Sequence, residues 1–220
     1  MNAISYEEAL KNDKRTFLQF YLSLLKENHI LIFSFNPNKD YNPYIIKICL
    51  FFLIISLIFF INTLFFNDSA MHQIYIDKGI FNFSYFFPQI IYSVIICSII
   101  YAILRKAYLT KKDILKIKYE NNKDLLNARI INTLKCLNIK FICFFVINIL
   151  FLLIFWLYLS SFCIVYLNTQ LYLFKVLLIN FSIYLVFPFF IYLIPTSFRI
   201  LSLNESEKCF YNISKFIQFL

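Results

Sequence analysis

The sequence predicts an all-α integral membrane protein: a bundle of about four transmembrane helices preceded by an N-terminal amphipathic helix. Of the 220 residues, 61% are hydrophobic and only 15% are charged, whereas soluble domains are about half apolar and a quarter charged. A chain of this length leaves much of its surface exposed, so one small core cannot bury so large a share of hydrophobic residues. Four apolar runs are also long enough to cross about 30 Å of hydrocarbon, which takes roughly 20 helical residues.

These four apolar runs are the predicted spans, and they contain no Asp or Glu. They lack the alternation of apolar and polar residues that a membrane β-barrel requires. Lipid offers the backbone no hydrogen-bond partner, so each run is expected to be a helix. Lys47 lies one turn inside the first run, where a lysine reaches the headgroups by snorkelling. The spans are expected at about 44–66, 86–104, 141–165 and 176–194.

Lysines and arginines predict the orientation of the spans. Nineteen of the 21 lie in residues 1–47, 105–140 and 195–220, and only Lys78 and Lys175 lie in the other two connections. Both termini are therefore expected in the cytoplasm, with the spans in the plasma membrane or an endomembrane. The predicted parts are a cytoplasmic N-terminal segment, 1–43, a four-span membrane domain, 44–194, with a basic cytoplasmic loop, 105–140, and a cytoplasmic tail, 195–220.

The N-terminal segment has the pattern of an amphipathic helix. Ser5 and Glu8 form a capping box, and an apolar stripe follows at helical spacing. Two placements stay open: the helix lies on the inner leaflet, or it packs under the bundle. No signal peptide is visible, so the first span would be its own insertion signal, unless the chain is a piece of a longer one. The stripe comprises Phe17, Phe20, Tyr21, Leu24 and Leu25, and Asn36, Pro37 and Asn38 end the segment.

The basic loop 105–140 is expected to be helical and to face anionic lipids. Thr110 and Asp113 predict a helix start, and the polar Asn121 and Asn122 are expected to interrupt the helix. Its ten basic residues are accompanied by only two aromatic residues, Tyr108 and Tyr119, whereas nucleic-acid binding needs base-reading or stacking groups beside the charges. We therefore expect no nucleic-acid partner, and attraction to anionic inner-leaflet lipids explains the charge better.

Several kinds of catalytic site are excluded by the scarcity of glycine and histidine. With Gly79 alone, the chain has no dinucleotide-binding, phosphate-cradling or nucleophile-elbow motif. His29 and His72 do not have zinc-ligand spacing. The one concentrated group of ionisable residues in the first outer loop is Asp68, His72 and Asp77, where a cation or pH-sensing site competes with a solvated loop. We predict no catalytic, cofactor-binding or metal-ligating residue, and no cofactor.

Modification sites are weakly indicated. Asn67 and Asn82 lie in glycosylation sequons, but chance matches are frequent in a chain rich in asparagine. The six cysteines contain no C-x-x-C pair and do not indicate a disulfide framework. Cys136 and Cys209 lie near the inner membrane surface, where palmitoylation competes with a role as small buried apolar residues.

Inside the spans the notable polar residues are Asn62, Asn148 and Asn180. Each would either bond across helices, which contributes about 1 kcal/mol, or line a polar path. Pro88 and Pro188 are expected to bend two spans and to free carbonyls that neighbouring groups must satisfy. The absence of acidic residues from the spans disfavours a proton-coupled carrier.

Two resemblances add to these patterns. The strings KRTFLQFYLSLLKENHILIFSF, FFNDSAMHQIY, LKIKFICFF, FWLYLSSFCIVYLNTQ and FPFFIYLIPTSFRI resemble the C-terminal membrane region of large uncharacterised multi-pass proteins of AT-rich single-celled eukaryotes. That resemblance covers the chain from about Lys14 onward and implies no activity. A fainter resemblance is to the early transmembrane spans of the polycystin group. It is carried by Ile61–Phe66, the Arg105–Lys106 pair, Trp156 and the Pro195–Arg199 pattern, and it lacks that group's pore.

Three functions follow as hypotheses. The favoured one is a non-catalytic multi-pass membrane module, an anchor or assembly unit that forms the membrane end of a larger surface protein. The first alternative is a subunit of an ion channel or transporter, homo- or hetero-oligomeric, in which Asn62 and Asn180 line the pathway. The second alternative is a membrane enzyme that modifies lipids, for which only the Asp68, His72 and Asp77 group qualifies.

Overall fold

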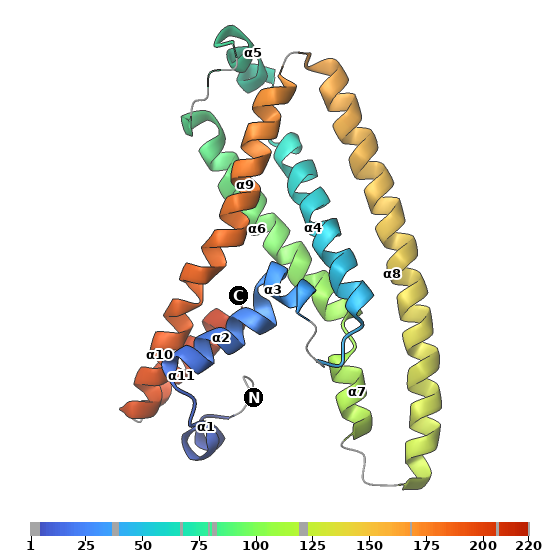
Figure 1. The fold of residues 1–220 in the computed structure, drawn as a ribbon, viewed down its shortest axis with the longest axis vertical. Helices are drawn as coiled ribbons and strands as arrows, with labels where there is room; N and C mark the ends of the chain where they lie inside the picture. The colour runs from blue at the N-terminus through green and yellow to red at the C-terminus, as the bar shows by residue number, and fades with distance from the viewer. Residues whose placement is uncertain are drawn as a thin grey trace. The chain divides into compact units, whose positions relative to one another are not determined.

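The computed structural model describes residues 5–36, 40–66, 68–78, 80, 83–118, 123–167, 169–205 and 207–219. Over these residues the chain is all helical and has no strand, which confirms the predicted fold class. The helices, drawn in Figure 1, are α1 (Tyr6–Asn12), α2 (Phe17–Asn28), α3 (Ile30–Phe35), α4 (Tyr44–Leu64), α5 (Asp68–Ile76), α6 (Phe83–Tyr108), α7 (Lys111–Lys118), α8 (Lys123–Val165), α9 (Gln170–Ile191), α10 (Leu193–Asn204) and α11 (Lys208–Phe219).

Four helices among the described residues are long and apolar enough to cross a membrane, as the sequence predicts. The stretches lie in α4, in α6, in α8 and in α9 continued by α10. Helix α8 has 43 residues and therefore a length of about 65 Å, roughly twice the hydrocarbon thickness. The third predicted span is thus the last part of a longer helix, because residues 123–140 contain no proline or glycine to end it. The expected interruption at 119–122 lies outside the described residues.

The connection between the first two spans contains a short helix. Asp68–Ile76 is helix α5, and Met71 and Ile74 on it are buried. These two apolar residues are three apart and lie on one helix face, so the helix forms by covering them. The segment is thus helical, while its Asp68 and His72 side chains are exposed as a solvated connection requires.

The chain divides into two compact units. The terminal unit comprises Met1–Asn36 and Ile183–Leu220, and the central unit comprises Pro37–Ser182. The boundary falls within α9, so this helix contributes its first part to the central unit and its last turns to the terminal unit. The two ends of the sequence therefore build one unit together.

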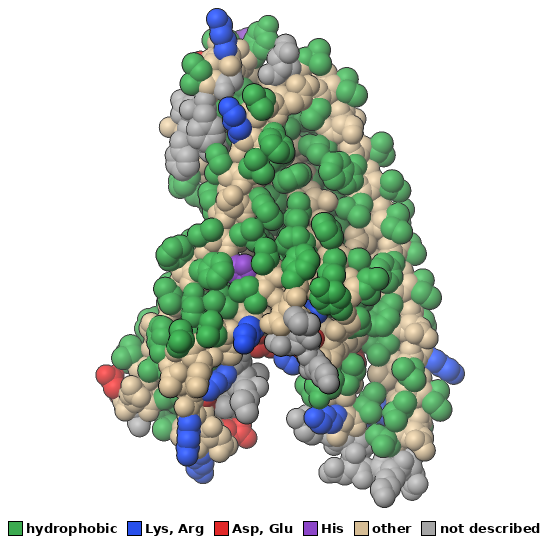
Figure 2. Space-filling view, viewed as in Figure 1, with side chains coloured by type: hydrophobic (Ala, Val, Ile, Leu, Met, Phe, Trp, Pro, Cys, Tyr) green, Lys and Arg blue, Asp and Glu red, His purple; other side chains and the backbone are tan. Residues whose placement is uncertain are grey.

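Helix α4 is the core of the central unit. It packs against α6 and α8 and lies between them in Figure 1. Half of its most apolar stretch is buried, against 17% for the corresponding stretch of α8. Aromatic rings join the helices: the centroids of Phe60 and Phe155 are 4.5 Å apart and the rings are stacked. The exposed side chains of the later part of α8, from Ile142 to Val165, are mostly apolar, and Figure 2 shows hydrophobic side chains along this helix; they fit a lipid environment.

The terminal unit is built on α10, which packs against α2 and α11. The capping box of Ser5 and Glu8 is present, but α1 ends at Asn12. The apolar stripe lies on α2, which begins with a second capping box of Thr16 and Gln19. The expected single helix is therefore two helices, because Thr16 supplies a new start. The stripe is divided: Phe20, Leu24 and Leu25 are buried and Phe17 is exposed.

Candidate functional site

The most concentrated charge cluster of the described residues lies in the terminal unit. Arg199 of α10 donates to Asp13 Oδ2 from Nε at 3.0 Å and from Nη2 at 2.5 Å. Arg15 donates to the same carboxylate, to Oδ1 from Nε and to Oδ2 from Nη2, both at 2.7 Å. The side chains of Asp13 and Arg199 are only 4% and 2% exposed. One buried carboxylate therefore bridges two guanidinium groups.

Aromatic rings enclose the Arg199 guanidinium. Its Cζ lies 4.6 Å from the Phe20 ring centroid and 4.9 Å from that of Tyr211. Arg15 also stacks on Phe20, at 4.8 Å. Cation–π contacts of this kind attract a cation that has lost its water. They help to offset the desolvation of Arg199.

The cluster holds Asp13 in its ionised form. Burial alone would raise the pKa of Asp13, but the hydrogen bonds and positive charges of Arg15 and Arg199 outweigh it and lower the pKa to about 2. The carboxylate does not change its charge near neutral pH. The arrangement suits a permanent link between segments that lie 186 residues apart, and it does not suit proton transfer.

A second polar junction of the terminal unit lies beside Pro188 in α9. His29 Nε2 lies 2.8 Å from the carbonyl oxygen of Leu185, and the Tyr21 hydroxyl donates to the carbonyl of Phe189 at 3.0 Å. Pro188 has no N–H group and α9 ends three residues later, so carbonyls near it need outside donors. Side chains of the N-terminal segment bond to two carbonyls beside Pro188, those of Leu185 and Phe189. The carbonyl to which Pro188 itself cannot donate is that of Tyr184, four residues earlier.

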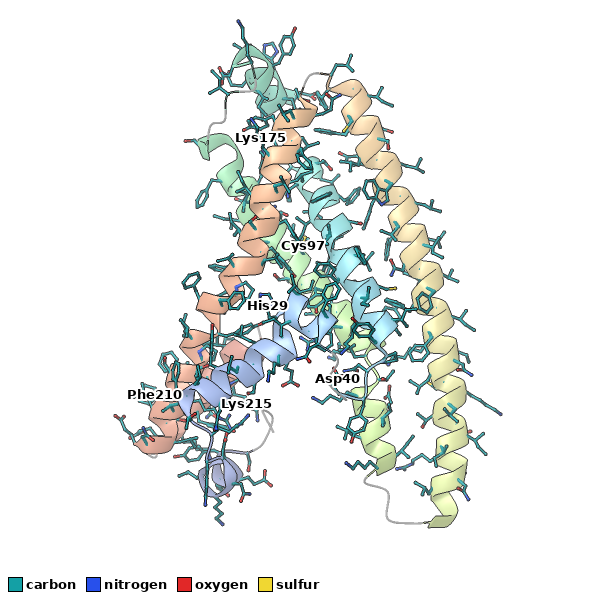
Figure 3. The ribbon with its side chains drawn as sticks, viewed as in Figure 1. His29, Asp40, Cys97, Lys175, Phe210 and Lys215 are labelled. Atoms are coloured by element: carbon teal, nitrogen blue, oxygen red, sulfur yellow. The ribbon has the colours of Figure 1, made fainter. Side chains whose placement is uncertain are left out.

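The bonds of His29 define its tautomer. Its Nδ1 accepts from the backbone N–H of Ile32, at 3.4 Å, and caps α3. A carbonyl only accepts, so Nε2 carries the proton and Nδ1 does not. His29 is therefore bound as a neutral imidazole. It is 2% exposed and lies between α2 and α3 (Figure 3).

The asparagines of the predicted spans have different environments. Asn180 donates to Ser93 Oγ at 3.1 Å, which confirms a bond across helices, here from α9 to α6. Asn62 is completely buried in α4, and neither atom of its amide has a partner among the described residues. Asn148 is 7% exposed, and its Oδ1 likewise has no partner there. Of the two predicted roles, a bond across helices or the lining of a polar path, the first is confirmed for Asn180 among the described residues.

Polar contacts also fix the ends of the spans near residues 40–47 and 109–113 in the central unit. Lys47 is 2% exposed and lies 3.5 Å from Asp40, so it pairs with a carboxylate within the protein instead of snorkelling as predicted. Lys140 donates to the carbonyl of Leu109 at 3.0 Å and to Asp113 at 3.1 Å. Asn42 Oδ1 accepts from the backbone N–H groups of Thr110 and Lys111, which caps the predicted helix start.

An open groove of about 550 Å³ lies beside α8 near this junction. It is broad and shallow, and charged, hydroxyl and apolar side chains line it together. Such a groove accommodates a polar headgroup better than a small apolar molecule, for which enclosed apolar sites are typical. Its lining is Asp113, Ala128, Arg129, Asn132, Thr133, Cys136 and Leu137.

The group of Asp68, His72 and Asp77 between the first two spans does not assemble into a site among the described residues. The Tyr166 hydroxyl donates to Asp68, which raises the pKa of Tyr166. Gln73 donates to Asp77 at 3.3 Å, and His72 is exposed. Among the residues that the structure describes, no three His, Cys, Asp or Glu side chains come together to hold a metal.

The candidate modification sites are only partly described. Asn67 and Asn82 lie outside the described residues. All six cysteines are described and are free thiols. Cys97 is buried, whereas Cys136 and Cys209 are exposed. The hypothesis that these last two are buried apolar residues is therefore wrong, because each lies on the outer face of its helix.

Comparison with known proteins adds no relative: no protein-family model, curated protein or solved structure matches this chain. The polar groups must therefore be interpreted from their geometry. Of the two clusters in the terminal unit, sequence analysis anticipated only that the carbonyls near Pro188 would need partners.

Proposed function

We propose that this chain is a non-catalytic multi-pass membrane module, an anchor or assembly unit. The observation that carries the proposal is how buried charge is used. Buried Asp13 and Arg199 join segments that lie 186 residues apart, and buried Lys47 is paired with Asp40. A side chain that is fixed in an ion pair stabilises the fold, whereas a catalytic acid or base needs access to a substrate proton.

The proposed orientation places both termini in the cytoplasm. The distribution of lysines and arginines supports it. The terminal unit supports the placement of both termini on the same side of the membrane, since it joins Asp13 near the start of the chain to Arg199 near its end. Segments in direct contact outside the spans must be on one side of the membrane.

We propose anionic inner-leaflet lipids as partners of the 105–140 segment. Lys106, Lys118 and Lys135 are exposed there, and each basic residue near a charged leaflet contributes about 1 kcal/mol of attraction. The groove beside α8 offers a place for a headgroup. Nanodiscs with phosphatidylserine should retain that lipid around the wild-type chain, and less of it around K106Q/K135Q. Equal retention by this variant and by the control K11Q would refute lipid binding at this segment.

The resemblances support a place in a larger surface protein. An antibody against residues 110–135 would measure the size of the endogenous protein on a blot of membranes. We expect a band much larger than 26.5 kDa. A band at that mass would refute the proposal of a larger protein and leave a small membrane module.

A channel or transporter subunit is the second candidate, and buried Asn62 with its unsatisfied amide is the observation that favours it. A polar group in hydrocarbon is costly unless it meets water, an ion or a partner. Ion flux into proteoliposomes that contain the purified chain discriminates the two functions. We expect flux equal to that of empty vesicles. Flux above that level, abolished by N62L and kept by the exposed-site control N127L, would replace the anchor with a channel.

A further inference from the structure

We infer that α2 and α3 form a re-entrant element whose outward apolar face is covered by lipid acyl chains of the leaflet where the fourth span ends. The inference concerns the N-terminal segment, which sequence analysis places in the cytoplasm. It does not depend on whether the chain is an anchor or a channel.

Helices α2 and α3 are attached to α9 at a level inside the predicted fourth span. Their donors, Tyr21 and His29, bond to Phe189 and Leu185 of α9. These two acceptors precede Ile194, the predicted inner end of the fourth span, by five and nine residues. At 1.5 Å per residue, the attachment points lie roughly 8 and 14 Å inside the hydrocarbon boundary.

The contacts of α2 show the direction in which it runs. Near its start, Phe20 lies against Arg199, which follows Ile194 by five residues and carries the buried ion cluster. One residue later Tyr21 reaches Phe189, and at the end of α2 His29 reaches Leu185. Helix α2 therefore begins at the charged level of α10 and leads toward the interior of the span. Helix α3 follows directly from His29.

The outward face of α2 and α3 is apolar. Leu18 and Leu22 of α2 are 62% and 42% exposed, and Leu31 of α3 is 40% exposed. These side chains lie on the opposite side from buried Phe20 and Leu24, so α2 is apolar on two faces. A helix in water does not need a second apolar face. Lys26 continues the row of Leu18 and Leu22, and its long stem lets the ammonium group reach the headgroups.

The outward face of α2 and α3 adjoins exposed apolar side chains of α9 in the same unit. Val186, Phe187 and Phe190 of α9 are 51%, 49% and 63% exposed, and they belong to a helix long and apolar enough to span the membrane. Helices α2 and α3 are attached through Tyr21 and His29 to Phe189 and Leu185 of α9, next to these exposed side chains. Lipid acyl chains that cover these side chains of α9 therefore also cover the outward face of α2 and α3.

The neutral state of His29 agrees with this depth. A charged side chain inside the bilayer costs several kcal/mol, whereas the bonds of His29 to Leu185 and Ile32 fix the uncharged imidazole. Polar backbone is tolerated at such depth only where protein covers it, and the carbonyls beside Pro188 are covered by His29 and Tyr21.

The test compares two leucines of the terminal unit with similar exposure, Leu31 at 40% and Leu10 at 43%. In a variant whose native cysteines are alanine, L31C or L10C carries an environment-sensitive fluorophore, in vesicles of phosphatidylcholine and phosphatidylserine. We expect the label at 31 to lose most of its emission to acyl-chain nitroxide lipids and little to iodide. We expect the reverse at 10, since α1 adjoins the ion cluster. Iodide quenching at 31 as strong as at 10 would overturn the inference.

A second measurement avoids the loss of the cysteines. A photo-reactive diazirine residue at position 31 of the otherwise native chain should form an adduct with phospholipid, which mass spectrometry identifies, and the same residue at position 10 should form none. An adduct with a second copy of the chain, or with another protein, in place of lipid would also overturn the inference.

Discussion

The terminal unit and the central unit bury polar groups in opposite ways. In the terminal unit a carboxylate and a guanidinium, Asp13 and Arg199, are almost fully buried. Within the spans of the central unit most of the buried polar groups are amides and hydroxyls, such as Asn62, Asn180 and Ser93, and the buried Lys47 lies in the first turn of α4, where it pairs with Asp40. Paired charges stabilise the junction of the terminal unit, whereas the interior of a bilayer gives an unpaired charge no compensation. The difference fits a central unit whose spans lie in lipid.

The largest effect is expected from breaking the ion cluster. R199M keeps the bulk of the side chain but leaves Asp13 buried with Arg15 alone, and removing one partner of a buried pair costs about 3 kcal/mol. Hydrogen–deuterium exchange should rise in α2, α10 and α11 and stay unchanged in α4. The control K208M concerns an exposed residue of α11 and should change little. Equal exchange in R199M and K208M would show that the cluster does not stabilise the unit.

The next largest effect is a pH dependence restricted to the terminal unit. The pKa of Asp13 lies below its ordinary value of 3.8, at about 2, so its stabilising contribution is complete above pH 3.8 and disappears as the pH falls through about 2. The shift corresponds to about 2 kcal/mol. Acid titration followed by exchange in α2 and α10 measures it, and D13N should lack this step. A step of the same size in D13N would assign it to other carboxylates.

A smaller effect of opposite sign is expected in the central unit. N62L replaces a buried amide without partners by an apolar side chain of similar size, and this should stabilise α4 by about 1–2 kcal/mol. Thermal unfolding in detergent and exchange in α4 measure it, with N127L on the exposed part of α8 as control. If N62L destabilises the unit instead, Asn62 has a water, ion or helix partner in the membrane.

These contrasts also explain what the sequence predicts well. Hydropathy finds α4, α6, α8 and α9 because lipid requires long, uninterrupted apolar helices. It does not find α5, where two buried apolar residues are enough, or the new start of α2 at Thr16. Hydropathy also does not determine where α8 begins, since residues 123–140 contain no proline or glycine that would interrupt a helix.

The candidate site was less predictable because its partners are distant in the sequence. Asp13 and Arg199 are separated by 186 residues, and His29 and Leu185 by 156, so no local spacing reveals them. One signal was present: Arg199 follows a span and has no Asp or Glu within four residues on either side. A buried arginine without a local acid needs a partner from elsewhere. The proline at 188 likewise indicates that donors are needed without indicating which residues supply them.

The smallest expected effect tests whether charge alone distinguishes the two units. Each unit has a neutral bond to a helix: Tyr21 to Phe189 in the terminal unit and Asn180 to Ser93 in the central unit. Y21F and N180L should each cost about 1 kcal/mol, measured by thermal unfolding and by exchange in α9. Y92F, at a tyrosine that is 55% exposed, should cost less than either. If Y21F costs as much as R199M, the junction beside Pro188 and not the ion cluster holds the terminal unit together, and its stability should then be insensitive to acid.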